Sequence, residues 1–275
     1  MTMRALTLRD GRQLVVHDAS DDDRGAPALL WHHGSPQTGA LLQPLVEAAT
    51  ARGFRLISYA RPSYGGSSPR PRRTVASAAE DVEQALGALG VDRFATMGAS
   101  GGGPHALACA ALLPDRVIGA VTLASPAPYT GDDEWFAGMV APGALRSALQ
   151  GREARADYAR TDEFDPDVFT ATDWAALEDR WASLGQDAAL AAAAGADGLI
   201  DDDVAFAAPW GFDLAVITVP VLIVQGGQDR MIPAMHGRWL AHRIPASELW
   251  LRPADGHVSI LDACGAAMDW LQALA

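Results

Sequence analysis

The sequence predicts an α/β fold, with a doubly wound, mostly parallel β-sheet and a helical insertion in the middle of the chain. Short apolar runs alternate with helix-like segments toward both ends of the chain. The apolar runs lack regular polar alternation, which is typical of central strands covered on both faces. Between about 130 and 215 the alternation stops, and helix-like patterns continue without obvious strands. Strand–helix alternation of this kind favours parallel pairing, with helices packed on both faces of the sheet.

A hairpin and six buried strands account for the apolar runs. Segments 3–9 and 12–17 flank Asp10-Gly11, a pair that favours a tight hairpin turn. The six predicted strands that follow are 28–33, 54–60, 93–98, 117–125, 220–227 and 248–254.

Five helices are predicted between and after these strands. Gly53 and Gly90 follow two of them, as glycine often does at a helix C-terminus, and Pro114 ends a third. The predicted helices are 38–52, 74–89, 102–113, 234–243 and the amphipathic segment 259–274.

Residues 130–215 are predicted to form a helical insertion between two core strands. The stretch holds four of the eight tryptophans and many acidic residues. Ligands of open α/β sheets bind at the carboxyl ends of strands, where such insertions emerge. We therefore expect a cap over that edge, with a core domain formed by 1–129 and 216–275. An ordinary helical subdomain remote from any site is the alternative interpretation.

Composition restricts the partners of the chain. Arginine supplies all 21 basic residues, against 34 acidic ones, and the net charge is −13. This balance opposes non-specific binding to nucleic acid or to an anionic membrane. No signal-peptide pattern begins the chain, and no apolar run reaches about 18 residues. We expect a soluble, cytoplasmic protein that acts on a small molecule and has no nucleic-acid or membrane partner.

The sequence predicts neither a metal site nor a cofactor. Without lysine, the chain has no residue for Schiff-base chemistry and no P-loop lysine. Cys109 and Cys264 lie 155 positions apart and make no CxxC pattern, so they are interpreted as small core residues. His32 and His33 have no carboxylate or cysteine at ligand spacing nearby.

A serine in a glycine cluster is the candidate nucleophile. Gly98-Ala99-Ser100-Gly101-Gly102 fits G-x-S-x-G, directly after a predicted strand and directly before a predicted helix. A sharp turn there would raise the Ser100 hydroxyl above the sheet, with small neighbours preventing collisions. A phosphate-binding turn fits this sequence less well, because Ser100 occupies the second glycine position of the GxGxxG motif.

A serine hydroxyl needs a base, a carboxylate that orients the base, and donors for an oxyanion. Asp229 follows the strand at 220–227, and His257 follows the strand at 248–254. The chain order Ser100, Asp229, His257 is the order expected for a triad on this architecture. Taken alone, Asp229 could be a surface turn residue and His257 a helix-entry residue.

The oxyanion donors are predicted to be the backbone N–H groups of Ser35 and Gly101. Ser35 lies in Trp31-His32-His33-Gly34-Ser35-Pro36, which follows an early strand, and we expect His33 and Gly34 to support this loop. The candidate pocket residues lie in four further segments and are Tyr64, Ser125, Trp135 and Met231. For Tyr64 and Ser125, ordinary packing explains their presence equally well.

Together these segments resemble the α/β-hydrolase superfamily over nearly the whole chain outside the insertion. HGSP at 33–36 looks like the family's HGxP oxyanion loop, and GASGG at 98–102 like its nucleophile elbow. LPDRV at 113–117 is similar to its lead into the sixth strand, and GGQDRMIP and DGH to its acid and histidine loops. One segment departs from the family pattern, because Ala60 and Ser63 replace the aspartate and glycine of D-x-P-G-x-G-x-S.

The resemblance implies a serine hydrolase of the esterase-like branch, with a helical cap, that cleaves a small or medium carboxylic ester through an acyl-enzyme. Haloalkane dehalogenases and epoxide hydrolases use an aspartate where this chain has Ser100, and HHGSP and GASGG differ from the HGGPG and GGSWG of proline iminopeptidases. The alternatives are a carbon–carbon bond hydrolase or lyase, a thioesterase with the same triad, or a ligand-binding or signalling protein of this fold.

Overall fold

The computed structural model describes residues 1–19 and 25–274. Within these residues eight strands form one sheet, in the order β1-β2-β4-β3-β5-β6-β7-β8. The strands are β1 (Thr2–Thr7), β2 (Gln13–Asp18), β3 (Ala28–His32), β4 (Arg55–Tyr59), β5 (Phe94–Ala99), β6 (Val117–Leu123), β7 (Val221–Gly226) and β8 (Ser247–Arg252).

The sheet is mostly parallel, as the sequence predicts. Strands β1 and β2 form the antiparallel hairpin, and β2 pairs antiparallel with β4. The pairs β3–β4, β3–β5, β5–β6, β6–β7 and β7–β8 are all parallel. The carboxyl ends of these six strands therefore meet at one edge of the sheet.

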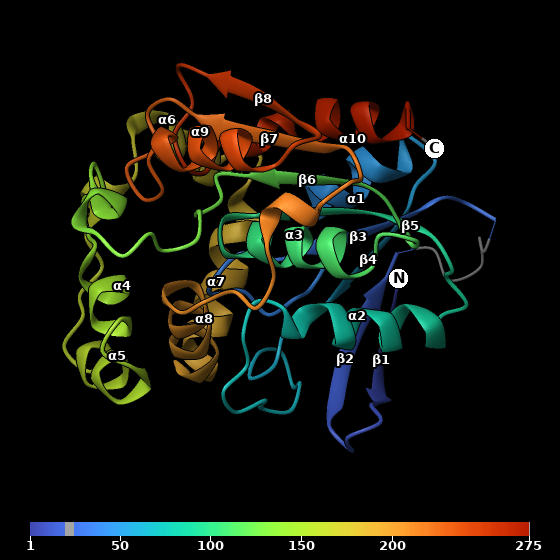
Figure 1. Ribbon diagram of the computed structural model, residues 1–275, viewed down its shortest axis with the longest axis horizontal. Coiled ribbons are helices and arrows are strands. Elements are labelled where there is room, and N and C mark those ends of the chain that lie inside the picture. The colour runs from blue at the N-terminus through green and yellow to red at the C-terminus, as the bar shows by residue number, and fades with distance from the viewer. Residues whose placement is uncertain (20–24, 275) are drawn as a thin grey trace.

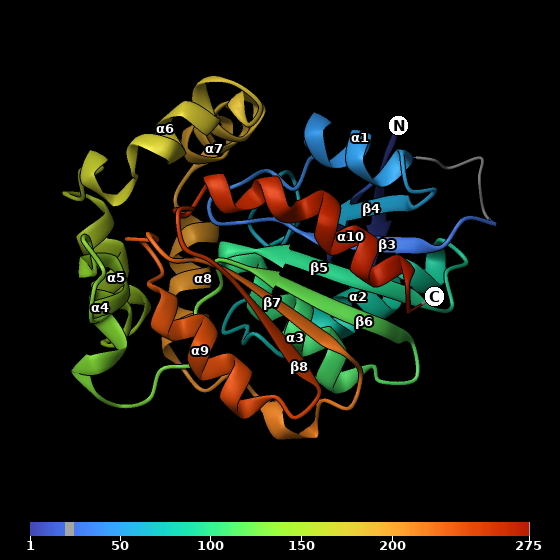
Figure 2. The ribbon, with the colours of Figure 1, turned by 90° about the horizontal axis from the view of Figure 1, so that it is seen from above.

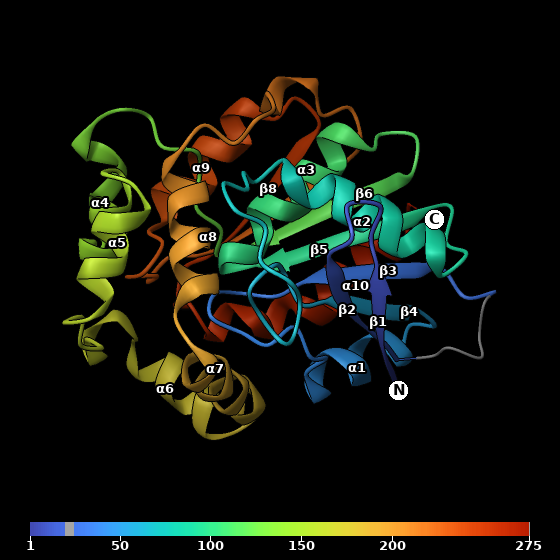
Figure 3. The ribbon, with the colours of Figure 1, turned by 90° about the horizontal axis from the view of Figure 1, so that it is seen from below.

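Helices cover both faces of the sheet, which confirms the doubly wound class (Figures 2 and 3). One face carries α1 (Gln43–Thr50) and α10 (Cys264–Gln272), and the other carries α2 (Ser77–Ala88), α3 (Gly103–Leu112) and α9 (Ala234–Arg243). Each face has its own apolar core, with Leu45 and Met268 in the first and Leu86 and Leu107 in the second.

Most predicted helices and strands differ from the structure at their ends, and for two helices and one strand the backbone gives the reason. The helix expected at 38–52 begins only at Gln43, because Gly39 has φ +91° and a β-carbon there would overlap the backbone of Ala60. The segment 259–274 starts as a 3₁₀ turn, η5 (Ser259–Ala263), before α10. The strand expected at 117–125 ends at Leu123, since Ala124 adopts the left-handed region with φ 47°.

Between β6 and β7 the regular elements are helical. The insertion helices are α4 (Gly143–Ala148), α5 (Arg152–Ala159), α6 (Ala171–Glu178), α7 (Ala182–Ala194) and α8 (Asp197–Ala207), accompanied by 3₁₀ turns η2 (Asp133–Phe136), η3 (Pro166–Val168) and η4 (Leu214–Val216). Figure 1 shows α4–α8 beyond the carboxyl ends of the strands. Over residues 1–19 and 25–274, no helix combines the length and apolarity needed to cross a bilayer.

Candidate active site

Ser100 stands at a strained turn between β5 and α3. Its φ is +51°, a left-handed conformation rare for a non-glycine residue. The turn η1 (Ser100–Gly102) connects Ala99 to α3. A β-carbon on Gly98 would overlap the backbone of Gly102, and one on Gly102 would overlap the His32 carbonyl oxygen. Glycine at both positions therefore allows the chain to turn here and present the serine at the sheet edge.

The structure brings Ser100, His257 and Asp229 into contact. The Ser100 hydroxyl donates to His257 Nε2 over 3.0 Å, and His257 Nδ1–H donates to Asp229 Oδ2 over 2.8 Å. A carboxylate only accepts hydrogen bonds, so Asp229 assigns the proton to Nδ1 and leaves Nε2 as the acceptor. The three residues follow β5, β8 and β7, whose carboxyl ends lie at the same sheet edge.

The electrostatics of the histidine suit a base. Burial of the ring disfavours its charged form, but the Asp229 carboxylate and its hydrogen bond outweigh burial and raise the pKa of His257. Asp229 is itself fixed, because its Oδ1 accepts the backbone N–H groups of Met231 over 2.9 Å and Ile232 over 2.8 Å.

The loop after β3 lies against the turn that carries Ser100. A β-carbon on Gly101 would overlap Ser35 Oγ, and one on Gly34 would lie 3.7 Å from the Ser100 β-carbon. His33 is fully buried behind this loop. Its Nδ1–H donates to the Gly34 carbonyl oxygen over 2.7 Å, and its Nε2 accepts the Arg61 backbone N–H over 3.1 Å. His33 therefore contacts the loop from behind, and both of its ring nitrogens are engaged there rather than at Ser100.

Arg61 and Asp202 form a buried ion pair beneath the same loop. Asp202, on α8, is 0% exposed and accepts Arg61 Nη2 over 2.7 Å and Arg73 Nη1 over 2.5 Å. It also accepts the Ser35 hydroxyl over 2.5 Å. Arg61 donates in turn to the carbonyl oxygens of His33 and Gly34. The insertion thus contributes the central acceptor of a network that holds the loop bearing Ser35.

The charge of Asp202 is maintained despite its burial. Loss of solvation disfavours the carboxylate, but Arg61 and Arg73 outweigh this and hold the pKa of Asp202 well below its usual value. At neutral pH the network contains one carboxylate between two guanidinium groups.

A second buried aspartate from the insertion holds the loop that carries the histidine. Asp173, on α6, accepts the backbone N–H groups of Val258 and Ser259, each over 2.8 Å, and the Ser259 hydroxyl over 2.9 Å. Thr170 donates both its N–H and its hydroxyl to the other oxygen. Burial alone would raise the pKa of Asp173, but these hydrogen bonds outweigh it and lower the pKa.

A third insertion aspartate binds the loop just beyond Pro36. Asp187, on α7, accepts the Thr38 backbone N–H over 3.0 Å, and also the Thr38 hydroxyl and the Gln37 amide. Helices α6, α7 and α8 therefore each place one buried carboxylate against a core loop next to Ser100. Sequence reasoning missed all three, because an aspartate on a helix looks like a surface residue until its partners are known. It also missed Arg61, whose carboxylate partner lies 141 positions away.

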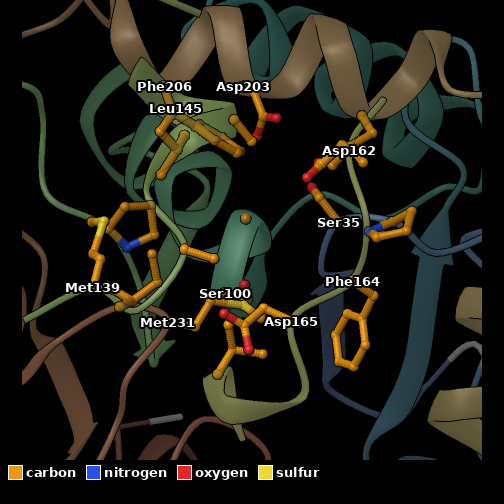
Figure 4. A pocket seen from close by; sticks show the side chains of 18 of the residues that line it. Ser35, Ser100, Met139, Leu145, Asp162, Phe164, Asp165, Asp203, Phe206 and Met231 are labelled. Carbon is orange, nitrogen blue, oxygen red and sulfur yellow. The ribbon is translucent and has the colours of Figure 1, made fainter. Parts of the chain in front are cut away.

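Two cavities meet at Ser100. One has a volume of about 250 Å³ and the other about 680 Å³. Ser35, Pro36, Ser100, Phe164 and Met231 border both. Figure 4 shows the smaller one, with Phe206, Leu145 and Asp203 across the cavity from Ser100. Burial raises the pKa of Asp203 to about 6, against the opposing effect of Arg155.

Of the four expected pocket residues, only Met231 borders these cavities. Tyr64 is buried and donates to Asp202 over 2.9 Å, so its hydroxyl belongs to the ion-pair network. Ser125 donates to the Ser100 carbonyl oxygen over 3.2 Å and packs beneath the turn. Trp135 donates to the Ala127 carbonyl oxygen and lines a separate cavity of about 210 Å³. The expectation was wrong for these three residues, because each side chain forms a hydrogen bond outside the two cavities.

Comparisons with known proteins agree with this architecture. A family model described as the alpha/beta hydrolase fold matches residues 27–263. The putative carbamate hydrolase RutD of Caulobacter sp. (strain K31) is 26% identical over 271 residues, which cover 90% of this chain and 89% of that protein.

Solved structures with the same architecture cover both chains almost completely. A hydrolase from Pseudomonas aeruginosa PA01 is 25% identical with a TM-score of 0.72, over 99% of this chain and 98% of that one. A thermophilic esterase from Thermogutta terrifontis shares the fold at 21% identity with a TM-score of 0.74, over 100% and 99% of the two chains. The match of the family model over most of the chain decides the assignment: this protein belongs to the alpha/beta hydrolase fold family and is an enzyme of that family.

Proposed function

We propose that the protein is a serine hydrolase that cleaves a carboxylic ester through an acyl-enzyme intermediate. The observation that carries the proposal is the unbroken contact from Asp229 through His257 to Ser100, with distances of 2.8 and 3.0 Å. These are hydrogen-bond distances over which a proton can be transferred between nucleophile and base.

In the proposed mechanism, His257 Nε2 removes the Ser100 proton while Ser100 Oγ attacks the ester carbonyl carbon. The backbone N–H groups of Ser35 and Gly101 donate to the oxyanion that forms. His257 then gives the proton to the departing alcohol, and Asp229 stabilises the positive charge on the ring throughout. Water activated by the same histidine hydrolyses the acyl-enzyme and regenerates Ser100.

The segment 130–215 acts in this proposal as a cap over the site. Its helices supply walls to both cavities, among them Leu145 of α4 in the smaller and Leu184 of α7 in the larger. A site enclosed in this way excludes water from the reacting carbonyl, which strengthens every electrostatic interaction there.

The experiment compares wild type with Ser100→Ala and with Ser68→Ala as a matched control. Ser68 lies away from the site and accepts the Gln13 backbone N–H. We expect wild type and Ser68→Ala to hydrolyse p-nitrophenyl acetate and butyrate, and Ser100→Ala to be inactive although folded. A serine-directed fluorophosphonate should label wild type and Ser68→Ala only. Labelling of Ser100 without turnover of any ester would favour a binding or signalling role instead.

A carbamate is the second candidate substrate, because the curated relative is named as a putative carbamate hydrolase. The same attack would form a carbamoyl-enzyme at Ser100. Ethyl carbamate and ethyl acetate present the same leaving alcohol, so their kcat/KM ratio in one assay decides between the two acyl classes.

A further inference from the structure

The two cavities at Ser100 are not equivalent with respect to the histidine. His257, Val258 and Leu261 line the larger cavity, whereas Gly101 and Phe206 line the smaller one. His257 does not border the smaller cavity. The base therefore faces one of the two spaces that extend from the nucleophile.

During acyl transfer this asymmetry decides on which side of Ser100 the alcohol and the acyl chain of an ester lie. This step rests on the proposed function. When the ester C–O bond breaks, the proton that His257 took from Ser100 moves from Nε2 to the alcohol oxygen, while the acyl carbon stays bonded to Ser100 Oγ. The alcohol oxygen must lie within hydrogen-bond reach of Nε2 for that transfer. The rest of the alcohol then extends into the space that His257 borders, and the acyl chain extends to the other side.

The two cavities also differ in volume and in the polarity of their lining residues. The larger one, about 680 Å³, is lined by apolar side chains that include Leu177, Trp181 and Leu184. The smaller one, about 250 Å³, lies below the range of about 300–1,000 Å³ typical of complete ligand pockets. Its lining includes the buried pair of Arg155 and Asp203, in which Arg155 Nε donates to Asp203 over 2.7 Å.

We propose that the larger cavity is the subsite for the leaving alcohol and the smaller cavity the subsite for the acyl group. The substrate class is then an ester of a bulky, apolar alcohol with a short acyl chain. Burying an apolar group of the alcohol against Trp181 and its neighbours strengthens binding by about fourfold for each methylene, equivalent to ~0.8 kcal/mol. On the acyl side the same apolar group would enter the smaller cavity, whose lining includes the charged pair of Arg155 and Asp203.

Isomeric esters test the assignment without any change in composition. Benzyl acetate and methyl phenylacetate are isomers that carry the phenyl ring on opposite sides of the ester, with leaving alcohols of similar acidity. The corresponding naphthalene pair is 2-naphthylmethyl acetate and methyl 2-naphthylacetate. Hydrolysis is followed by acid release at constant pH with wild type, and with Ser100→Ala as the blank.

We expect kcat/KM to favour benzyl acetate over methyl phenylacetate by about tenfold or more, and the naphthalene pair to show a larger ratio. Two substitutions of half-buried alanines narrow one cavity each: Ala188→Phe the larger and Ala144→Phe the smaller. Ala188→Phe should lower the ratio of kcat/KM for benzyl acetate to kcat/KM for methyl acetate. Ala144→Phe should lower the corresponding ratio for methyl butyrate and methyl acetate.

The outcomes separate this inference from the proposed function. Ratios near one, or a preference for methyl phenylacetate, would overturn the subsite assignment while Ser100-dependent turnover leaves the hydrolase in place. If no ester is hydrolysed and Ser100 is not labelled, the proposed function itself fails. The isomer comparison uses wild type alone, so it tests the subsite assignment even if a phenylalanine variant does not fold.

Discussion

Replacing Asp202 by asparagine should destabilise the protein strongly, since it removes the carboxylate that pairs with two buried arginines. Arg61 and Arg73 have side chains only 1% and 3% exposed, and both pair with Asp202. Removing one partner of a buried ion pair costs about 3–5 kcal/mol, because the remaining charge stays buried without compensation. For a chain of this size, that corresponds to a loss of roughly 6–20 °C in Tm, at about 2–4 °C for each kcal/mol.

Asp197→Asn is the matched control for this measurement. Asp197 lies on the same helix α8, and in its pair with Arg152 the two side chains are 73% and 52% exposed. Exposed pairs contribute about 0–1 kcal/mol, so the control should stay near wild type. Urea unfolding at pH 7.5, followed by circular dichroism, measures both free energies of unfolding. Equal stabilities for Asp202→Asn and Asp197→Asn would refute the view that this network holds the loop after β3.

The pH dependence of the same variant follows from the lowered pKa of Asp202. A group whose pKa falls on folding contributes stability above its unfolded value, near 3.9. That contribution is lost as the pH falls through the lower, folded pKa. The stability difference between wild type and Asp202→Asn should therefore be full at neutral pH and shrink below about pH 4.

Three further predictions concern the site. Asp229→Asn should lower kcat by up to about 10⁴-fold through loss of tautomer control, and should move the acidic limb of the kcat/KM profile to lower pH. In wild type we expect that limb above the ordinary histidine pKa near 6.5, because Asp229 raises the pKa of His257. An unmoved limb in the variant would contradict this cause. Asp173→Asn should reduce kcat by roughly 10- to 100-fold, since small displacements of catalytic groups are costly. The crystal structure of this variant should show the 257–259 loop displaced. A kcat equal to that of wild type would contradict a positioning role for Asp173. Gly101→Ala should lower kcat by about 10² or more, because its β-carbon overlaps Ser35 Oγ, and Ser35→Ala in the same chain should recover part of the loss if that overlap is the reason.

The sheet and the three loops at its edge could be predicted because their signals are local. Strand runs are mostly apolar, and the ends of β5 and β8 differ from the predicted ones by at most two residues. Glycine clusters around Ser100 report the turn directly. Since parallel strands end together, the order of Ser100, Asp229 and His257 is enough to predict their proximity.

The residues that support the site could not be predicted in the same way. Asp202 stands between two other aspartates on α8, and Asp173 is one of two acidic residues on α6, so nothing in the local sequence distinguishes them from exposed carboxylates. Their burial depends on partners far along the chain, such as Arg61 at 141 positions from Asp202. The pocket residues fail for a related reason: Tyr64 follows a strand as expected, but its hydroxyl finds a carboxylate that only the folded insertion provides.

The three carboxylates on α6, α7 and α8 make the segment between β6 and β7 a support for the loops next to Ser100, so this segment is not freely exchangeable. A chimera that replaces 130–215 with the equivalent segment of another hydrolase would leave the amides of Val258, Ser259 and Thr38 and the guanidinium of Arg61 without these acceptors. Changing substrate preference by recombination should therefore work best when the donor segment brings an acid to each of those three places, and point substitutions in the cavity walls should be the gentler route.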